Sequence, residues 1–362
     1  MKKKIKVCLL FGGKSGEHEI SLLSAKSIYN ALDKTKYKVI LVAIDKQGKW
    51  LLLNASNYLL NSSNSKLIKI NKANSKNITF VSKGKKAELL SLESRITITS
   101  VDVFFPIIHG TFGEDGCIQG LLELLNTAYV GANVLGSSVG MDKDIMKKLL
   151  RDAKIPIAKF NTFKRGEKVN IKGLQYPVFV KPANMGSSVG IVKVKNKKEL
   201  NFAIKKAFLY DTKILIEEYI KAREIECSVL GNENPIASVP GEIIPKHEFY
   251  SYIAKYIDKN GAELKIPAKL SSKKIKEIQS LAIKAYKALE CSGMARVDFF
   301  LTLKGKIILN EINTLPGFTK ISMYPKLWEI SGIPYTKLLD RLIELAIEKK
   351  KQKDSLKREF SV

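Results

Sequence analysis

The sequence has few cysteines and no long apolar run, and both absences limit what the protein can be. Cys8, Cys117, Cys227 and Cys291 are dispersed and form no CxxC pair, the spacing typical of redox and metal sites. We interpret them as reduced, packed thiols of a cytoplasmic protein. The apolar stretch Ile5–Phe11 ends at two glycines, so it predicts a short strand rather than a signal peptide or a membrane span.

Acidic residues are scarce relative to basic ones. The chain has 62 Lys and Arg against 35 Asp and Glu, which gives a formal net charge of +27. Basic proteins can bind nucleic acid, membrane surfaces or small anions. The lysines are scattered through every segment without an arginine-rich helix, so we predict no nucleic-acid and no membrane partner. A basic polyanion-binding protein is kept as an alternative, and the tail Lys349–Arg358 is interpreted as a frayed helix end.

Two common phosphate-binding motifs are also absent. Gly13-Lys-Ser15 resembles the end of a Walker A loop, but the first glycine of that motif would have to stand at Cys8. The dinucleotide pattern GxGxxG fails at the same place. What is left is a strand-to-helix turn that carries Glu17, where the helix dipole favours an acid whether or not it has a function.

Alternating strand and helix patterns predict an α/β protein, and 362 residues suffice for two or three domains. Residues 54–77, rich in Asn, Ser and Lys, are predicted to be an exposed excursion. Asp142 is predicted to cap a helix whose apolar face is Ile145, Met146, Leu149 and Leu150. The other main predicted elements are strands Ile5–Phe11, Val39–Ile44, Val101–Ile107 and Ile214–Tyr219, and helices Ser21–Leu32, Ser272–Leu289 and Thr336–Lys349, with a further helix capped by Asn196.

A predicted hairpin in residues 295–317 carries three oxygen-bearing side chains. Side chains two apart on a strand share a face, so Glu311 and Asn313 point to one side. Asp298 can face Glu311 across the antiparallel pair, and hard oxygens of this kind suit Mg²⁺. The alternative is that Asp298 forms a salt bridge with Arg296 while Glu311 is merely solvated.

A glycine loop, Met185–Gly190, lies between two predicted strands. Small residues there allow backbone N–H groups to close over phosphates, and Lys181 before the loop adds a positive charge. An ordinary hairpin is an equal alternative. Downstream, an apolar strand reaching Glu217 and Glu218 suits an adenine, and Glu224 can accept hydrogen bonds from ribose hydroxyls. Taken singly, these acids are most often surface charges.

The order and spacing of four motifs resemble the ATP-grasp superfamily and, within it, the D-alanine–D-alanine ligase family. The motifs are Phe11-Gly-Gly-Lys-Ser-Gly-Glu17, the loop His109–Gly120, the segment Phe249–Tyr256, and Arg296-Val-Asp-Phe-Phe300 followed by Leu309–Gly317. The likeness extends from about residue 5 to about residue 346. It implies an α/β ATP-grasp ligase of three domains, over residues 1–140, 141–220 and 221–362, the first of them Rossmann-like (biotin-carboxylase-like).

The resemblance implies that ATP lies between the second and third domains. It assigns phosphate contacts to Lys143, Lys181 and Ser188, the adenine hinge to Glu217, Glu218 and Tyr219, and the ribose to Glu224. It also implies that Asp298, Glu311 and Asn313 bind two Mg²⁺ or Mn²⁺ ions, which bridge the β- and γ-phosphates.

The implied reaction joins two D-alanines through an acyl phosphate, for peptidoglycan precursor synthesis. The resemblance places Glu17, Ser187 and Tyr256 at the first D-alanine, His109 near the transferring groups, and Lys255, Ser322 and the helix N-terminus at Met323 at the carboxylate of the second. Arg296 and the backbone N–H of Gly317 would receive the negative charge of the tetrahedral intermediate.

Three readings stay open at this point: a dipeptide ligase, a related ligase that uses D-lactate or D-serine as acceptor, and an inactive polyanion-binding homologue. Tyr256 fits the dipeptide branch of the family. Ser251 and Met323 depart from the usual Asp and Leu, and the first of these departures puts loop closure in doubt. The family also implies a homodimer that pairs through its N-terminal portion.

Overall fold

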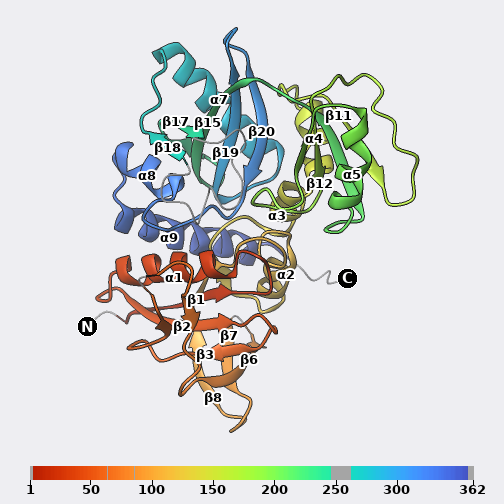
Figure 1. Cartoon of the computed structure of the whole chain (residues 1–362). Coiled ribbons are helices and arrows are strands. Elements are labelled where there is room, and N and C mark those ends of the chain that lie inside the picture. Colours follow the sequence, from red (N-terminus) through yellow and green to blue (C-terminus); the bar gives the residue numbers. More distant parts are fainter. Residues whose placement is uncertain (1–2, 63, 85, 246–261, 358–362) are drawn as a thin grey trace, which may run out of the picture.

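The computed structural model describes residues 3–62, 64–84, 86–245 and 262–357 of the chain. Three sheets carry the architecture (Figure 1). They have eight, four and six strands, and a separate two-stranded ribbon lies beside the first. Because strands and helices alternate around each sheet, the α/β class predicted from the sequence is confirmed.

The N-terminal sheet has the strand order β10-β9-β1-β2-β3-β6-β7-β8. Strand β1 is buried along most of its length and pairs in parallel with both neighbours, as expected for an unbroken apolar run covered on two faces. The elements are β1 (Ile5–Gly12), α1 (His18–Ala31), β2 (Tyr37–Ile44), β3 (Trp50–Leu52), β6 (Lys76–Lys83), β7 (Lys86–Ser91), β8 (Thr97–Val101), β9 (Val103–Ile107), α2 (Cys117–Leu124), β10 (Ala128–Tyr129) and α3 (Val134–Met141).

The segment predicted to be an exposed excursion is exposed at most of its described residues, as predicted, but three of its side chains anchor it to this sheet. Residues 54–77 contain the ribbon β4 (Leu59–Leu60) and β5 (Lys69–Ile70) and the first residues of β6. Tyr58, Ile68 and Ile70 are buried in the N-terminal core. Their irregular spacing among polar residues left no period for the sequence to reveal.

The central sheet has the order β11-β14-β12-β13 and is accompanied by two helices. Asn196 caps α5 by accepting the N–H groups of Lys198 and Glu199, as predicted. The elements are α4 (Lys143–Asp152), β11 (Phe160–Lys164), β12 (Val178–Pro182), β13 (Val192–Val194), α5 (Lys197–Ala207) and β14 (Lys213–Glu218).

Helix α4 has the predicted cap and half of the predicted buried face, since Met146 and Leu150 are fully buried. Asp142 accepts the N–H groups of Asp144 and Ile145. Ile145 and Leu149 are each 38% exposed, whereas Lys147 is only 1% exposed. Because a helix turns about 100° per residue, the side that buries Met146, Lys147 and Leu150 leaves Ile145 and Leu149 nearer to solvent. The predicted apolar face was therefore partly wrong, and two lysines, Lys143 and Lys147, occupy the covered side.

The C-terminal sheet follows the order β18-β17-β15-β19-β20, with β16 paired to β15. Helix α7 packs on one face of it in a second core. The elements are β15 (Ala222–Gly231), β16 (Ile236–Ala237), β17 (Gly241–Pro245), β18 (Ala262–Lys265), α7 (Ser272–Ala288), β19 (Gly293–Thr302), β20 (Ile307–Asn313), α8 (Met323–Ile330) and α9 (Tyr335–Asp354).

Helix α9, close to the C-terminus, packs against the N-terminal part of the chain. It lies along α1 between the N-terminal and C-terminal sheets (Figure 1), and its apolar face belongs to the N-terminal core. The helix continues to Asp354, and its half-buried Lys349 donates to Ser292 Oγ at 2.6 Å. The first part of the segment interpreted as a frayed helix end is therefore regular helix, the helix ends within the segment, and Arg358 lies outside the described residues.

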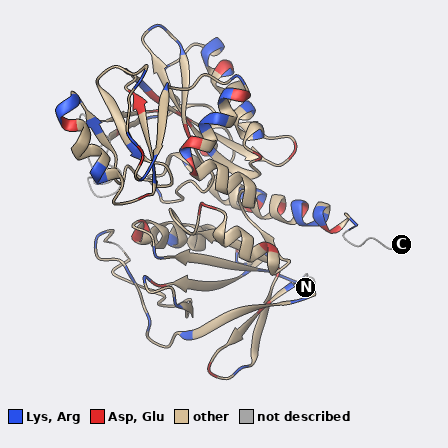
Figure 2. Cartoon of the chain, turned by 90° about the vertical axis from the view of Figure 1, so that its right-hand side faces the viewer, with Lys and Arg blue, Asp and Glu red and all other residues tan. Residues whose placement is uncertain are grey.

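The positive charge is not concentrated in one element. Lys and Arg occur on helices and loops of both halves of the molecule (Figure 2). No helix in the part of the chain that the structure describes is long and apolar enough to cross a membrane.

Candidate active site

A cleft lies between residues contributed by the three sheets and the loops beside them. Its lining combines residues that follow β1 and β9, the start of α4, the loop after β12, and strand β20 with the loop beyond it. The lining residues are Glu17, His109, Glu114, Gly140, Met141, Lys143, Gly186, Ser187, Arg296, Glu311, Ile312, Asn313, Thr314, Leu315, Pro316 and Gly317.

The β19–β20 hairpin has the predicted register. Asp298 stands opposite Glu311, and Arg296 stands opposite Asn313, with an irregularity directly after Asp298. The expected facing of the two acids is thereby confirmed. Asp298 also accepts hydrogen bonds from Arg296 Nε at 2.8 Å and Nη2 at 2.7 Å, so the salt bridge considered as an alternative is present as well.

Arg296 is held between two carboxylates. Besides Asp298, its Nε lies 2.9 Å from Glu226 Oε2. Burial by itself would lower the pKa of Arg296, but the charges of Asp298 and Glu226 outweigh it and raise that pKa further above its usual value. The guanidinium that lines the cleft is therefore a permanent cation.

The oxygen atoms of Asp298, Glu311 and Asn313 on the hairpin could bind a hard cation only together with further ligands. In the described ranges, no three His, Cys, Asp or Glu side chains stand close enough to hold a metal ion. Asn313 Nδ2 donates to Asp298 Oδ2 at 3.0 Å, and Glu311 faces the cleft. Two carboxylates and one amide fit Mg²⁺ if phosphate oxygens complete its coordination, because Mg²⁺ is commonly bound by one or two carboxylates and substrate phosphates.

Three lysines and one acid form a buried group beside the cleft. Glu217 Oε1 lies 2.9 Å from Lys181 Nζ, and Glu217 Oε2 lies 2.9 Å from Lys147 Nζ. Burial alone would raise the pKa of Glu217, but the two lysines lower it to about 2. Lys143, one helical turn before Lys147, donates from Nζ to the carbonyl of Met185 at 2.6 Å.

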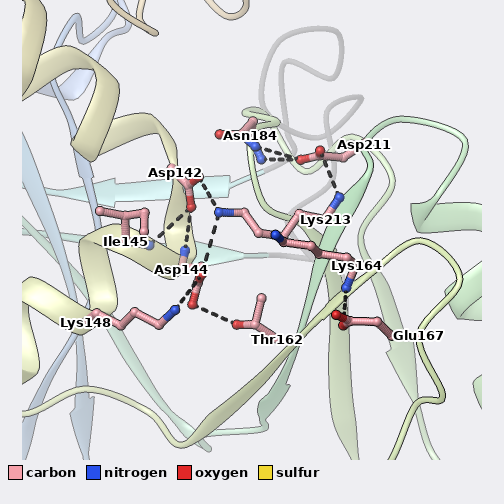
Figure 3. A network of polar contacts seen from close by, with 10 residues as sticks. All are labelled: Asp142, Asp144, Ile145, Lys148, Thr162, Lys164, Glu167, Asn184, Asp211 and Lys213. Atoms are coloured by element: carbon pink, nitrogen blue, oxygen red, sulfur yellow. Dashed lines mark hydrogen bonds and ion pairs between the residues drawn. The ribbon is translucent and has the colours of Figure 1, made fainter.

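Helix α4 is fixed to the central sheet by a polar network (Figure 3). Asp142 and Lys213 of β14 form an ion pair. Asp144 accepts from Lys148 at 2.9 Å and from Thr162 Oγ1 of β11 at 2.9 Å. These contacts join the first turn of the helix to two neighbouring strands, so the positions of Lys143 and Lys147 relative to the sheet are set.

The glycine loop reaches across to the N-terminal domain. Ser187 and Ser188 both have left-handed backbone angles, with φ of 52° and 62°. The Ser187 hydroxyl donates to the carboxylate of Glu17, which directly precedes α1. Residues 170 positions apart in the sequence thus meet at one side of the cleft.

A histidine and an acid lie at the base of the cleft. His109 Nδ1 is 3.1 Å from the carbonyl of Leu315 and 3.5 Å from Glu114 Oε1, and its Nε2 is 3.1 Å from Ser24 Oγ. Burial raises the pKa of Glu114 to about 6, with Glu17 adding to the effect and His109 opposing it. For His109, burial would lower the pKa, but the contact with Glu114 and nearby negative charges raise it.

The loop before α8 brings a helix N-terminus toward the cleft. Ser322 Oγ accepts the N–H of Thr319 at 3.0 Å. A Cβ atom on Gly317 would lie 2.7 Å from Ser322 Oγ, so a larger residue there would displace that hydroxyl. Ser322 and Met323, predicted to bind the second substrate, lie outside the cleft lining, and the side chain of Met323 is buried.

Two models of known families cover most of the chain. Residues 6–132 match "D-ala D-ala ligase N-terminus" and residues 149–344 match "D-ala D-ala ligase C-terminus". The chain belongs to the D-alanine–D-alanine ligase family. This confirms both the resemblance and the ATP-grasp fold predicted from the sequence motifs.

Relatives support the assignment over the full length. A D-alanine–D-alanine ligase of Oceanobacillus iheyensis is 53% identical over 99% of this chain and 98% of its own. The solved ligase structure from Coxiella burnetii is 42% identical, covers 97% of this chain and 96% of its own, and has a TM-score of 0.84.

Two further structures of the family bear on ligands. The D-alanine–D-alanine ligase of Bacillus anthracis complexed with ATP is 28% identical, with a TM-score of 0.72 over 96% of this chain and 99% of its own. The VanG D-Ala:D-Ser ligase of Enterococcus faecalis is 36% identical, with a TM-score of 0.83 over 95% of this chain and 100% of its own.

The cleft brings together many of the predicted site residues of this family member, but not all. Glu17, His109, Lys143, Ser187, Arg296, Glu311, Asn313 and Gly317 line it. Of the described residues predicted to bind nucleotide or metal, Lys181, Ser188, Glu217, Glu218, Tyr219, Glu224 and Asp298 lie outside that lining. Lys255 and Tyr256, and also Ser251, lie outside the described residues.

Sequence reasoning missed three charged residues of this ligase site. Glu114 stands inside the His109–Gly120 motif but was given no role, Lys147 was not considered, and Glu226 pairs with Arg296. A signal existed for Lys147, because it lies four residues after Lys143 and therefore on the same face of the helix. Nothing in the sequence pattern pointed to Glu226.

Proposed function

We propose that this chain joins two D-alanine molecules to D-alanyl-D-alanine, with cleavage of ATP to ADP and phosphate, for peptidoglycan precursor synthesis. The observation that carries the proposal is the meeting of Glu17, Lys143, Arg296 and Glu311 in one cleft of a chain with full-length ligase relatives. An acid for an ammonium group, cations for phosphates and carboxylates, and an acid for a metal ion are the groups that this reaction needs.

For the nucleotide, we infer that Lys143, Lys181 and the Ser188 loop contact the phosphates. The strand end at Glu217, Glu218 and Tyr219 would hold the adenine, and Glu224 the ribose. Asp298, Glu311 and Asn313 would hold two Mg²⁺ or Mn²⁺ ions, which when bound neutralise charge on the β- and γ-phosphates. The carboxylate chemistry of the hairpin supports this assignment.

The first step is attack by the carboxylate of one D-alanine on the γ-phosphorus of ATP, which forms D-alanyl phosphate and releases ADP. Glu17 would accept hydrogen bonds from the ammonium group of that D-alanine. The contact between Ser187 and Glu17 supports a closed loop over this substrate. Closing the loop excludes water, which would otherwise hydrolyse the acyl phosphate.

In the second step the free amine of the other D-alanine attacks the acyl carbon, and phosphate leaves. Arg296 and the N–H of Gly317 would stabilise the oxygen that becomes negative, a role in which a single donor is worth about 3 kcal/mol. Ser322, the N–H of Met323 and Lys255 would bind the carboxylate of this substrate. His109 would lie near the transferring groups.

The proton of the attacking amine is proposed to leave through Glu17, Ser187 and Tyr256. Unchanged kcat and KM in Tyr256→Phe would remove the tyrosine hydroxyl from this relay. Homodimer formation and a cytoplasmic location are further parts of the proposal, and the use of cytoplasmic ATP supports the latter.

The deciding experiment measures phosphate release by the purified chain with ATP, Mg²⁺ and D-alanine, followed by product analysis. Release of phosphate together with dipeptide is expected. D-serine is the second candidate acceptor, favoured by the similarity to the VanG D-Ala:D-Ser ligase, and parallel assays with D-serine and D-lactate separate these ligases. Absence of phosphate release would contradict the proposal and leave the polyanion-binding alternative.

A further inference from the structure

Lys147 is a fully buried charge without an assigned role. Its side chain is 1% exposed, and its ammonium lies 2.9 Å from Glu217 Oε2 and 5.9 Å from the centre of the Phe160 ring. Burial lowers the pKa of Lys147, and the charge of Glu217 opposes that effect. Burying an ammonium group is costly unless a paired charge compensates it, so the ion pair with Glu217 accounts for how this lysine is tolerated.

Glu217 is shared between two lysines. Its other oxygen lies 2.9 Å from Lys181, and Glu217 itself is 1% exposed. If Glu217 faced Lys181 alone, the two charges would cancel at short range in a poorly solvated environment. With Lys147 on the opposite oxygen, the group of three carries a net charge of one positive unit.

The surroundings keep Lys147 in this place. Asp142 and Asp144 anchor the first turn of α4 to β14 and β11, as Figure 3 shows. Glu217 lies in β14, paired with Phe179 of β12 and Phe160 of β11. The carboxylate is thus on a central strand, and Lys147 approaches it from the helix that covers the sheet.

We propose that Lys147 is a positioning residue for nucleotide binding: it occupies one oxygen of Glu217 and so leaves the charge of Lys181 available to the phosphates of ATP. The inference rests on the proposed function, because it takes Lys181 as a phosphate contact. Lys147 acts through Glu217 and touches no phosphate itself.

The test compares Lys147→Met, Glu217→Gln and the double variant by their dissociation constants for the Mg²⁺ complex of a non-hydrolysable ATP analogue, measured calorimetrically without D-alanine. Lys147→Met is expected to raise the dissociation constant about tenfold. A change of that size corresponds to the loss of roughly one charge-assisted hydrogen bond. Because Glu217 also belongs to the proposed adenine site, Glu217→Gln serves only as the reference for the double variant, whatever its own affinity. In that background the loss of Lys147 is expected to change the dissociation constant by less than about threefold.

Lys148→Met is the matched control, since Lys148 is the next residue on α4 and its side chain is 51% exposed in an ion pair with Asp144. Its nucleotide affinity should not change. A purely structural role for Lys147 predicts the same loss of affinity whether residue 217 is Glu or the substituted Gln, and either that result or unchanged binding in Lys147→Met overturns the proposal.

Two outcomes separate this inference from the function on which it rests. If Lys147→Met does not fold, Glu217→Gln and the double variant are compared instead, and unequal affinities would contradict action through Glu217. Failure of the unsubstituted chain to bind the ATP analogue would overturn both proposals. Nucleotide binding with the expected dependence on Glu217, but no turnover of D-alanine, would overturn only the proposed reaction.

Discussion

The carboxylate of Asp298 and the guanidinium of Arg296, two residues apart on strand β19, form a bidentate ion pair. Arg296 Nε donates to Oδ1 at 2.8 Å and Nη2 donates to Oδ2 at 2.7 Å. Since Asp298 is also the proposed metal ligand, one carboxylate connects the metal site to the cation that would stabilise the tetrahedral intermediate. Glu226 provides Arg296 with a second carboxylate. Arg296 would therefore keep a counterion if Asp298 bound a metal ion as proposed.

Glu311→Gln is predicted to abolish ligase turnover by at least about 100-fold while the fold stays intact. The substitution keeps the size of the side chain but removes the negative charge that a metal ion requires. Turnover is measured as phosphate release at saturating Mg²⁺, and thermal unfolding reports on the fold. Asp298→Asn should lose turnover to a similar degree.

The two hairpin variants should differ in stability. Asp298→Asn removes a hydrogen-bonded counterion of the buried Arg296, so it should lower the midpoint of thermal unfolding more than Glu311→Gln does. Full activity in either variant would contradict the metal assignment.

The raised pKa of Glu114 predicts that the free energy of unfolding depends on pH. Its pKa is raised from 4.5 to about 6 in the folded protein, so the folded state holds this proton more tightly than the unfolded state. The stabilisation is present below pH 4.5 and is lost as the pH rises through 6, by up to about 2 kcal/mol. The raised pKa of His109 acts in the same direction, because it too favours a protonated folded state.

Glu114→Gln should remove most of this loss. Urea unfolding of the unsubstituted chain and of the variant between pH 4.5 and 7.5 gives the difference in the free energy of unfolding. That difference is expected to shift in favour of the variant as the pH rises. A constant difference would show that Glu114 does not titrate in this range.

The hairpin could be predicted from the sequence because strand periodicity is local. Alternation of period two fixes which side chains share a face, and the tight turn at Gly305 fixes which residues oppose, so Asp298 and Glu311 were expected to face each other. The other charged residues that contact this hairpin come from strands distant in the sequence. Glu226 reaches Arg296 from β15, and no local pattern encodes that approach.

Tyr58 shows the same limit in the core. Its hydrophobic partners, Phe11 and Tyr29, contact it edge-on with ring centres 6.0 and 5.4 Å apart. Because they come from β1 and α1, burial of Tyr58 is set by tertiary packing. The composition of a segment rich in Asn, Ser and Lys therefore predicts the exposure of most of its residues but not the burial of Tyr58.

Tyr58→Ala is predicted to lower the free energy of unfolding by about 3 kcal/mol, as expected when a large buried side chain is removed. Leu67→Ala is the control in the same segment, since Leu67 is 53% exposed, and it should change stability little. Urea unfolding checks both. Equal small effects would show that the segment is not part of the core.

Gly110 should control the position of Glu17. Its φ is +77°, and a Cβ atom there would lie 2.8 Å from Glu17 Oε2 and 3.2 Å from Ser15 Cβ. Gly110→Ala should therefore displace the carboxylate proposed to bind the first D-alanine. Because small displacements in an active site can cost about 100-fold, kcat/KM for D-alanine should fall by about 10- to 100-fold, while KM for ATP changes less.

Gly305→Ala separates backbone strain from this displacement. Gly305 has the same φ of +77°, but a Cβ atom there would meet nothing within 4 Å. Both variants should lose a similar 1–2 kcal/mol of stability, roughly the cost of a left-handed backbone for alanine, and only Gly110→Ala should lose kcat/KM. Equal kinetic losses in the two variants would mean that strain in the chain, and not the approach of Gly110 to Glu17, determines D-alanine binding.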